Sequence, residues 1–197
     1  MLSFIFQYQL TGREEMKDMW YVIQVAEGTE ENIIPKIGRA LENVPDCNFI
    51  VPKYISNRRY QGMWHEEIKV LFPGYMFVDT VHSEEVLEGL KIFSANVKPV
   101  CIGGGFYPIR KEEQEFLLSM MNNRYEIELS VGNIVDGRLI VDAGPLKNRS
   151  SSVCRIDRHK RTAELVLTLW GEKRRVKVGL QVKERLTGDE YRRRAVS

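Results

Sequence analysis

The chain has 197 residues, 43% of them hydrophobic and 28% charged, and its formal net charge at pH 7 is +2. This composition is typical of a soluble globular protein and excludes a disordered or low-complexity chain. The three cysteines, Cys47, Cys101 and Cys154, are far apart and show no CxxC spacing, which argues against a zinc site or a disulfide framework and predicts a reducing, cytoplasmic location.

The first residues carry a short apolar segment, Leu2 to Leu10, with no basic residue before it. It is too short to cross a membrane and does not have the pattern of a secretory signal. Gly12 to Glu15 can be encoded by a purine-rich run that resembles a bacterial ribosome-binding site. We therefore expect translation to begin naturally at Met16 or Met19, with residues 1–18 an extension that is not native. An intact mass from the native host that retains those residues would contradict this.

After Met19 the pattern predicts an α+β domain, an antiparallel sheet with flanking helices, over residues 19–123. Trp20 to Val25 is rich in aromatic and β-branched residues, which indicates a strand. A helix from about Glu30 to Asn43 follows, and Pro35 predicts a kink or a later start. The other expected elements are strands at 47–55, 68–71, 75–79 and 97–102, a flexible hairpin tip at 56–62, and helices beginning at Ser83 and near Lys111.

Val70 to Val78 places a proline-glycine pair and three aromatic residues inside an apolar run. Pro73 cannot donate to a β ladder and Gly74 tolerates positive φ, so the pair should divide the run into two strands. The pattern alone allows either a buried strand with a bulge or a docking surface.

The second half changes both period and charge. After a linker at 124–131, the hydrophobic period becomes 2, with strands expected at 139–141, 153–157, 163–170 and 176–182. Short strands in this number make a small all-β barrel over 132–186, followed by a basic tail at 187–197. Residues 1–129 have a net charge of −6, whereas residues 130–186 have +7. This asymmetry predicts nucleic acid as the partner of the basic part and another partner for the acidic part.

Four motifs follow one another in a characteristic order: Trp20-Tyr21-Val22-Ile23-Gln24, Phe72-Pro73-Gly74-Tyr75, Pro108-Ile109 and Gly144-Pro145-Leu146. Together they resemble the NusG family of transcription elongation factors, over roughly Trp20 to Leu186. The resemblance implies an NGN domain followed by a small SH3-like KOW barrel. Two departures stand out, because Leu146 replaces an aromatic residue and Ser151 replaces a glycine. A turn that needs positive φ would be strained at Ser151.

The resemblance implies that the NGN domain binds the clamp region of RNA polymerase through an apolar pocket. The residues that match this pocket are Trp20, Tyr21, Phe72, Pro73 and Tyr75. The alternative is that Trp20 and Phe72 belong to the core. Tyr75 is favoured for contact, because an aromatic at a rigid turn offers area at low entropic cost. At the expected hairpin tip, Arg58 and Arg59 could approach upstream DNA or be merely solvated.

The second half carries two basic sets, which are Arg155, Arg158, His159, Lys160 and Arg161, and then Lys173, Arg174 and Arg175. With these two sets, the chain resembles the specialised NusG paralogs called LoaP, which are antiterminators that bind RNA through the KOW domain. Two cationic turns on one barrel could straddle phosphates, and arginine can also read guanine edges or stack on unpaired bases. The alternative is a solvated charge run. His159 is expected to hydrogen-bond or stack, because no second ligand lies at metal spacing.

The sequence shows no nucleophile elbow and no Walker loop, so we expect no enzyme, cofactor or metal. Together with the resemblance to the NusG family and to LoaP, these features predict a monomeric, processive antitermination factor that binds RNA polymerase and a structured RNA hairpin in the leader transcript. One alternative is a recruitment adaptor like RfaH, which reads non-template DNA and contacts the ribosome. Another is a general NusG that couples to Rho. Trp170, beside Gly171, is expected to be exposed, and the resemblance implies that its loop belongs to a surface that meets ribosomal protein S10 or Rho.

Overall fold

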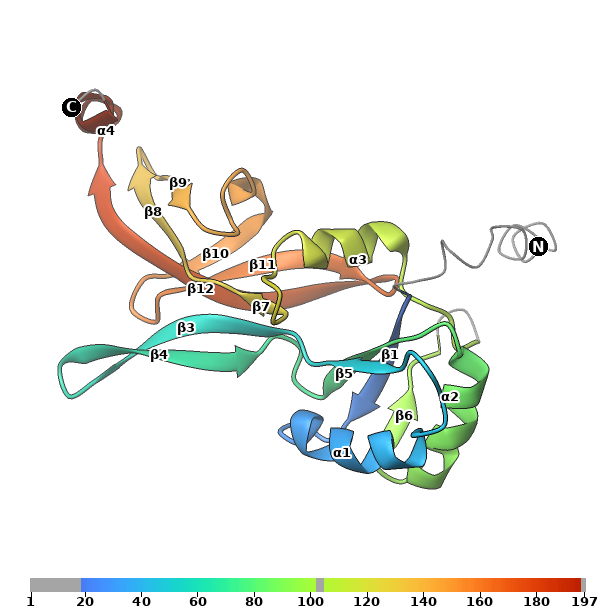
Figure 1. Cartoon of the computed structure of the whole chain (residues 1–197). Helices are drawn as coiled ribbons and strands as arrows, with labels where there is room; N and C mark the ends of the chain where they lie inside the picture. Colours follow the sequence, from blue (N-terminus) through green and yellow to red (C-terminus); the bar gives the residue numbers. More distant parts are fainter. Residues whose placement is uncertain (1–18, 102–104, 196–197) are drawn as a thin grey trace, which may run out of the picture. The chain divides into compact units, whose positions relative to one another are not determined.

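The structure, a computed structural model, describes residues 19–101 and 105–195, and the expected extension at 1–18 lies outside them. It confirms an α+β fold followed by a β-rich C-terminal sheet (Figure 1). The described residues form two compact units, the first from the residues up to 50 and from 73 to 111, and the second from 51–72 and from residue 112 onward. Residues 51–72 and 112–123 therefore cluster with the C-terminal sheet, across the expected boundary. Within the described residues, no helix is long and apolar enough to span a membrane.

The first unit is built on a four-stranded antiparallel sheet with the order β2-β5-β1-β6. The sheet consists of β1 (Trp20–Val25), β2 (Asn48–Ile50), β5 (Tyr75–Asp79) and β6 (Val97–Pro99). Two contacting helices, α1 (Glu30–Ala40) and α2 (Ser83–Leu90), accompany it, and η1 (Lys91–Phe93) follows α2. The central strands β1 and β5 are nearly continuous buried runs, so they form the core of this unit.

Two expectations for the first half are corrected. The expected strand at 47–55 is two strands, β2 and β3 (Lys53–Tyr60), separated by Val51 and Pro52. Proline has no N–H for a β ladder, so the break falls at this position. The helix α1 runs through Pro35 and ends at Ala40 rather than Asn43.

The second unit contains a three-stranded sheet of order β4-β3-β7 and a five-stranded sheet of order β10-β11-β12-β8-β9. The first comprises β3, β4 (Met63–Val70) and β7 (Glu126–Ile127). The second comprises β8 (Ser130–Val135), β9 (Arg138–Ala143), β10 (Val153–Asp157), β11 (Thr162–Leu169) and β12 (Glu172–Leu186). Its remaining elements are α3 (Lys111–Leu118), η2 (Ser150–Ser152) and α4 (Gly188–Ala195). The long strand β12 pairs antiparallel with β11 and then parallel with β8, so it joins the two halves of the sheet.

The β3–β4 hairpin is longer and more regular than expected. The segment 56–62, expected to be a flexible tip, is mostly strand, because β3 pairs with β4 as far as Tyr60 and Met63. Only Gln61 and Gly62 form the turn, with φ values of 49° and 80°. Two successive positive φ values are typical of the type I′ turn, whose twist matches that of the strands. Arg58 and Arg59 are therefore held in a β ladder.

The C-terminal sheet differs from expectation in three places. Strand β8 was not predicted, and the expected linker at 124–131 contains β7 and the start of β8. The basic residues 173–175 lie in β12 rather than in a turn. Strain at Ser151 was also predicted wrongly: residues 150–152 form η2, and the positive φ of this loop, 64°, falls on Asn148. Asparagine tolerates that conformation better than most residues.

Candidate nucleic-acid interface

The turn at Pro73, Gly74 and Tyr75 is anchored by a buried carboxylate of the same unit, that of Glu30. The N–H of Gly74, whose φ is 81°, donates to Oε1 of Glu30 at 2.7 Å, and Glu30 is only 3% exposed. The carbonyl of Gly74 accepts the N–H of Val25 at 2.9 Å. Pro73 is exposed and Tyr75 half-buried. The turn is thus fixed from behind while two of the expected polymerase-binding residues reach the surface.

The other three expected polymerase-binding residues, Trp20, Tyr21 and Phe72, are buried. Trp20 is 1% exposed, and its ring packs 5.1 Å from that of Phe77, measured between centroids. Burial of this extent is what the core alternative predicted for Trp20 and Phe72. Of the five expected polymerase-binding residues, Pro73 and Tyr75 in the turn are therefore the two that are accessible to a partner.

Trp170 is buried, contrary to expectation, and is 6% exposed. Its ring lies edge-on to Phe72 with centroids 5.6 Å apart, and the Arg174 guanidinium lies 4.3 Å from the Trp170 ring centroid. The backbone N–H of Trp170 donates to Oε2 of Glu113 on α3 at 3.0 Å. These contacts hold Trp170 at a φ of 39°, which is an unfavourable conformation for a bulky residue.

The structure does not bring the two basic sets together. Lys173, Arg174 and Arg175 pair with residues 168, 167 and 166 across the β11–β12 ladder. The β10–β11 turn lies at the other end of β11, and eight strand residues span about 26 Å. Arg174 also pairs with Glu172 at 2.9 Å. The second set is therefore separate from the first, and Arg174 acts in the packing around Trp170.

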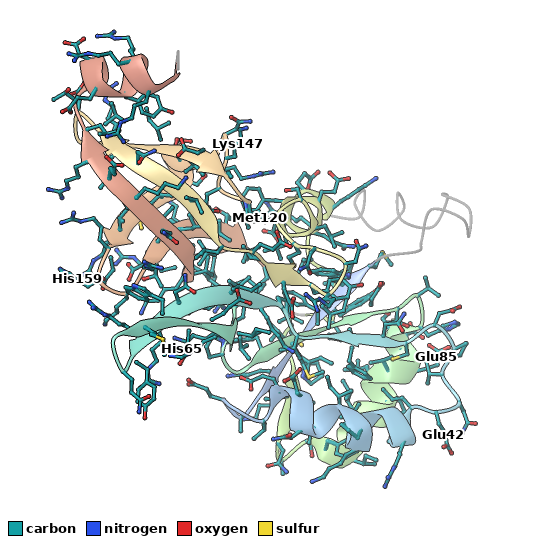
Figure 2. The ribbon with its side chains drawn as sticks, turned by 60° about the vertical axis from the view of Figure 1, so that its left-hand side comes forward. Glu42, His65, Glu85, Met120, Lys147 and His159 are labelled. Carbon is teal, nitrogen blue, oxygen red and sulfur yellow. The ribbon has the colours of Figure 1, made fainter. Side chains whose placement is uncertain are left out.

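The β10–β11 turn presents the first basic set. Oδ1 of Asp157 accepts the backbone N–H of Lys160 at 2.9 Å, which is the main reason why the pKa of Asp157 lies below its ordinary value. Arg158, His159 and Lys160 are exposed at the tip. Figure 2 shows His159 at one end of the C-terminal sheet and Lys147 at a separate place. A fixed turn with exposed cations can offer positive charge to a ligand at little ordering cost.

Arg161 differs from its neighbours because it contacts the β3–β4 hairpin. It is half-buried, and its guanidinium lies 3.7 Å from the ring centroid of Trp64. Burial lowers the pKa of Arg161, and the positive charge of Arg59 lowers it further. The side chain therefore joins the turn to the hairpin by a cation–π contact.

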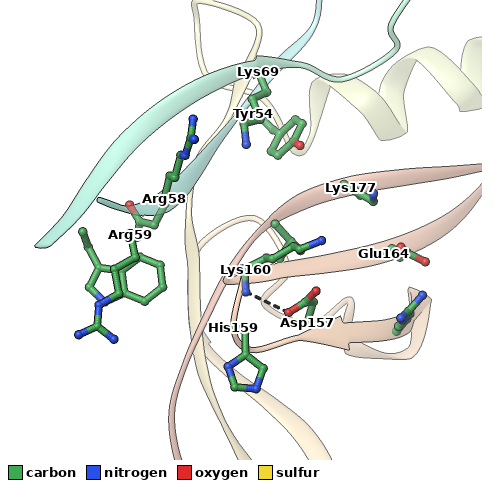
Figure 3. A pocket seen from close by; sticks show the side chains of 13 residues that line it. Tyr54, Arg58, Arg59, Lys69, Asp157, His159, Lys160, Glu164 and Lys177 are labelled. Carbon is green, nitrogen blue, oxygen red and sulfur yellow. Dashed lines mark hydrogen bonds between the residues drawn. The ribbon is translucent and has the colours of Figure 1, made fainter. Parts of the chain in front are cut away.

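A hollow of about 520 Å³ lies between the hairpin and the C-terminal sheet (Figure 3). We call it the basic groove. Its hairpin wall consists of Tyr54, Asn57, Arg58, Arg59, Trp64 and Lys69. Its sheet wall consists of Arg155, Asp157, His159, Lys160, Thr162, Glu164 and Lys177. The lining of the groove thus contains six lysine or arginine residues and two carboxylates, so its net charge is positive.

The groove unites two sets of residues that the sequence assigned to different ligands. Arg58 and Arg59, expected near DNA, line the same hollow as Arg155, His159 and Lys160, expected to bind RNA. The sequence did not identify Lys69 or Lys177 as site residues. Both lie on strands, and only the approach of one strand to another places them at the groove.

A glycine permits that approach. A Cβ at Gly179 of β12 would lie 2.1 Å from the carbonyl oxygen of Ile55 in β3, so any larger residue would force the two strands apart.

On the hairpin wall, Glu67 pairs with Arg58 at 3.4 Å and with Lys69 at 3.0 Å. The hydrogen bond from Lys69 is the main reason why the pKa of Glu67 is lowered. Glu67 therefore orients two of the cations.

Comparison with known proteins assigns the fold to a family. A family model described as "Transcription termination factor nusG" matches residues 18–118, just over half of the chain. The chain belongs to the NusG family. The resemblance inferred from the four ordered motifs is thereby confirmed at the level of the family.

Among described residues, no group of three or more His, Cys, Asp or Glu side chains is arranged to hold a metal ion.

Curated NusG relatives match over most of their length. The "Transcription termination/antitermination protein NusG" of Staphylococcus epidermidis is 23% identical over 177 residues, covering 85% of this chain and 95% of the relative. The protein of the same name from Staphylococcus aureus has the same identity and coverage. A solved structure titled "Domain interaction in Thermotoga maritima NusG" is 22% identical, with a TM-score of 0.47, and covers 85% of this chain and 95% of that one. The relatives are transcription factors, and this chain is a NusG-like transcription factor.

Proposed function

We propose that this NusG-family chain is a processive antitermination and elongation factor that binds RNA polymerase and a structured hairpin of the leader transcript. The turn with the exposed Pro73 and the half-buried Tyr75 is the polymerase-binding surface, and the basic groove is the RNA-binding surface. The observation that carries the RNA assignment is the excess of positive charge in the groove. Six cationic side chains from two sheets line it, together with only two carboxylates.

Phosphate recognition explains this charge better than protein binding does. Arginine offers a planar fork of donors that matches phosphate, and lysine provides a mobile point charge. Arg155 and Lys160 are exposed, so their charged groups are accessible to a ligand in the groove. RNA folds also present unpaired nucleotides, on which arginine can stack.

The alternatives receive less support from the described residues. A chain that contacts the ribosome or Rho through the loop at residue 170 would present the Trp170 ring, but this ring is buried against Phe72. Arg58 and Arg59, the residues expected near upstream DNA, share one groove with Lys160, which was expected to bind RNA. RNA is therefore the preferred ligand, and DNA is its competitor in the test.

The direct test is binding of the full-length chain to a pool of RNA stem-loops with randomised loops, measured by filter binding. We expect Arg155→Ala and Lys160→Ala each to weaken binding about tenfold, the effect of losing one charged hydrogen bond. Lys147→Ala, an exposed lysine of the same unit outside the groove, is the matched control. Equal binding by all three variants would overturn the RNA assignment.

A transcription assay then connects binding to antitermination. A template that encodes a selected stem-loop upstream of a terminator is transcribed with bacterial RNA polymerase and the full-length chain. We expect readthrough to rise with wild-type protein and to fall back with Lys160→Ala but not with Lys147→Ala. Readthrough that does not depend on the stem-loop would contradict the proposed function.

A further inference from the structure

The basic groove has two walls, and each contributes exposed cations. On the hairpin wall, Glu67 orients Arg58 and Lys69, and Arg59 stands beside them. On the sheet wall, Asp157 fixes the backbone of the turn at Lys160. Figure 3 shows Arg58 and Lys69 on the hairpin ribbon and Lys160 and Lys177 on the ribbons across from it. A chain of phosphates lying in the groove would therefore meet cations on both sides.

Two arginines in this region lie close enough to repel one another. Arg161 is held against Trp64, and the charge of Arg59 contributes to lowering the pKa of Arg161, after the larger effect of burial. Like charges in proximity are unfavourable until an anion lies between or beside them. A phosphate bound at Arg59 would relieve this repulsion.

The size of the groove indicates a single strand. Its volume of about 520 Å³ falls within the roughly 300–1,000 Å³ of sites that hold one small ligand. A duplex would rest on the rim, whereas one or two nucleotides of an unpaired strand can enter. At the outer end of the hairpin, Tyr60 is 59% exposed and offers a ring on which a base can stack.

We infer that the groove holds an unpaired stretch of RNA next to the stem-loop of the transcript. The β3–β4 hairpin of the protein and its β10–β11 turn both contact the phosphate backbone of this stretch. This inference rests on the proposed RNA-binding function and adds to it the strandedness of the ligand and a second protein element. The hairpin is then part of RNA selection, and Arg59 is a contact residue of the groove.

The test uses the full-length chain and three fluorescent probes. The first is an RNA stem-loop with a single-stranded uridine extension, the second is the same stem-loop without it, and the third carries a thymidine DNA extension instead. Affinities are measured by anisotropy for wild type, Arg59→Ala, Lys160→Ala and the control Arg193→Ala, an exposed arginine on α4. We expect Arg59→Ala to weaken binding of the first probe about tenfold and to leave binding of the second unchanged.

The outcomes separate the inference from the function beneath it. If Lys160→Ala and Arg59→Ala both bind every probe as Arg193→Ala does, the proposed RNA-binding function fails. If Lys160→Ala weakens RNA binding but Arg59→Ala weakens binding of no probe, the function stands and the inference is overturned. Equal loss on both RNA probes with Arg59→Ala would refute the single-strand assignment. Equal affinity for the DNA extension would refute RNA as the ligand of the groove.

Discussion

The guanidinium of Arg161 lies 3.7 Å from the ring centroid of Trp64, and so the β10–β11 turn is stacked on the β3–β4 hairpin. Arg161 was expected to contact RNA like its neighbours. Its guanidinium is half-buried against Trp64, so we expect Arg161 also to hold one wall of the basic groove against the other. We therefore expect the contact between Arg161 and Trp64 to stabilise the folded protein.

Arg161→Ala should lower the free energy of unfolding by about 1 kcal/mol, the range of a partly desolvated cation–π contact together with lost packing. Arg158→Ala changes an exposed arginine of the same turn and should leave the free energy of unfolding unchanged. Urea unfolding followed by circular dichroism measures both. Equal stability of the two variants would show that the stacking contributes nothing.

Glu113→Ala should destabilise the protein by about 1–3 kcal/mol, because it leaves the buried backbone N–H of Trp170 without the acceptor that it has at 3.0 Å. Glu113→Gln keeps an oxygen acceptor and should cost less. Glu112→Ala, the exposed neighbour on α3, is the control. Chemical denaturation distinguishes the three, and a Glu113→Ala variant as stable as Glu112→Ala would refute the anchoring role.

The turn at Gly74 depends on Glu30 in the same way. Glu30→Ala removes the acceptor 2.7 Å from the Gly74 N–H, and Gly74→Ala places a side chain at a φ of 81°, which costs about 1–2 kcal/mol. Both should weaken co-purification with RNA polymerase, because Pro73 and Tyr75 lose their fixed position, while RNA binding is retained. Glu27→Ala is the exposed control. Unchanged polymerase binding in both variants would argue against this surface.

Cys47 should be the least reactive of the three thiols. Burial, aided by the charge of Asp79, raises its pKa from 9.0 to about 11, whereas Cys101 and Cys154 are exposed. Only the thiolate reacts, so at about pH 8 its alkylation by iodoacetamide should be roughly 100-fold slower than that of an unshifted thiol. The rate should rise about tenfold per pH unit below pH 11. Peptide mass spectrometry measures each site, and labelling of Cys47 as fast as Cys101 would contradict the shift.

Local sequence patterns predicted the parts of the fold that local chemistry decides. The β-branched run from Trp20 gave β1, and the Pro73-Gly74 pair correctly marked the start of β5 at Tyr75. The hairpin at 53–70 was predicted as partly flexible, because its polar residues resemble a loop. Pairing along the whole ladder overrides that composition, since strand preference depends on cross-strand neighbours more than on the residue itself.

The basic groove could be predicted only in part. The charged turn at 158–161 is visible in the sequence, but Lys177 joins it only because β11 and β12 pair in register. The approach of β3 to β12 depends on Gly179, whose missing side chain is informative only when the opposing Ile55 carbonyl is known. Contacts between residues more than 100 positions apart carry no local signal.

The most direct test of the central claim is the salt dependence of RNA binding by the full-length chain. The probe is the stem-loop RNA with its uridine extension, and the slope of log affinity against log salt concentration counts the phosphates that are neutralised. For each lost contact to a single strand, the slope should become shallower by about 0.7. We predict this change, together with weaker binding, for Lys160→Ala but not for Lys147→Ala. Identical slopes and affinities for these two variants would contradict the assignment of the basic groove to RNA.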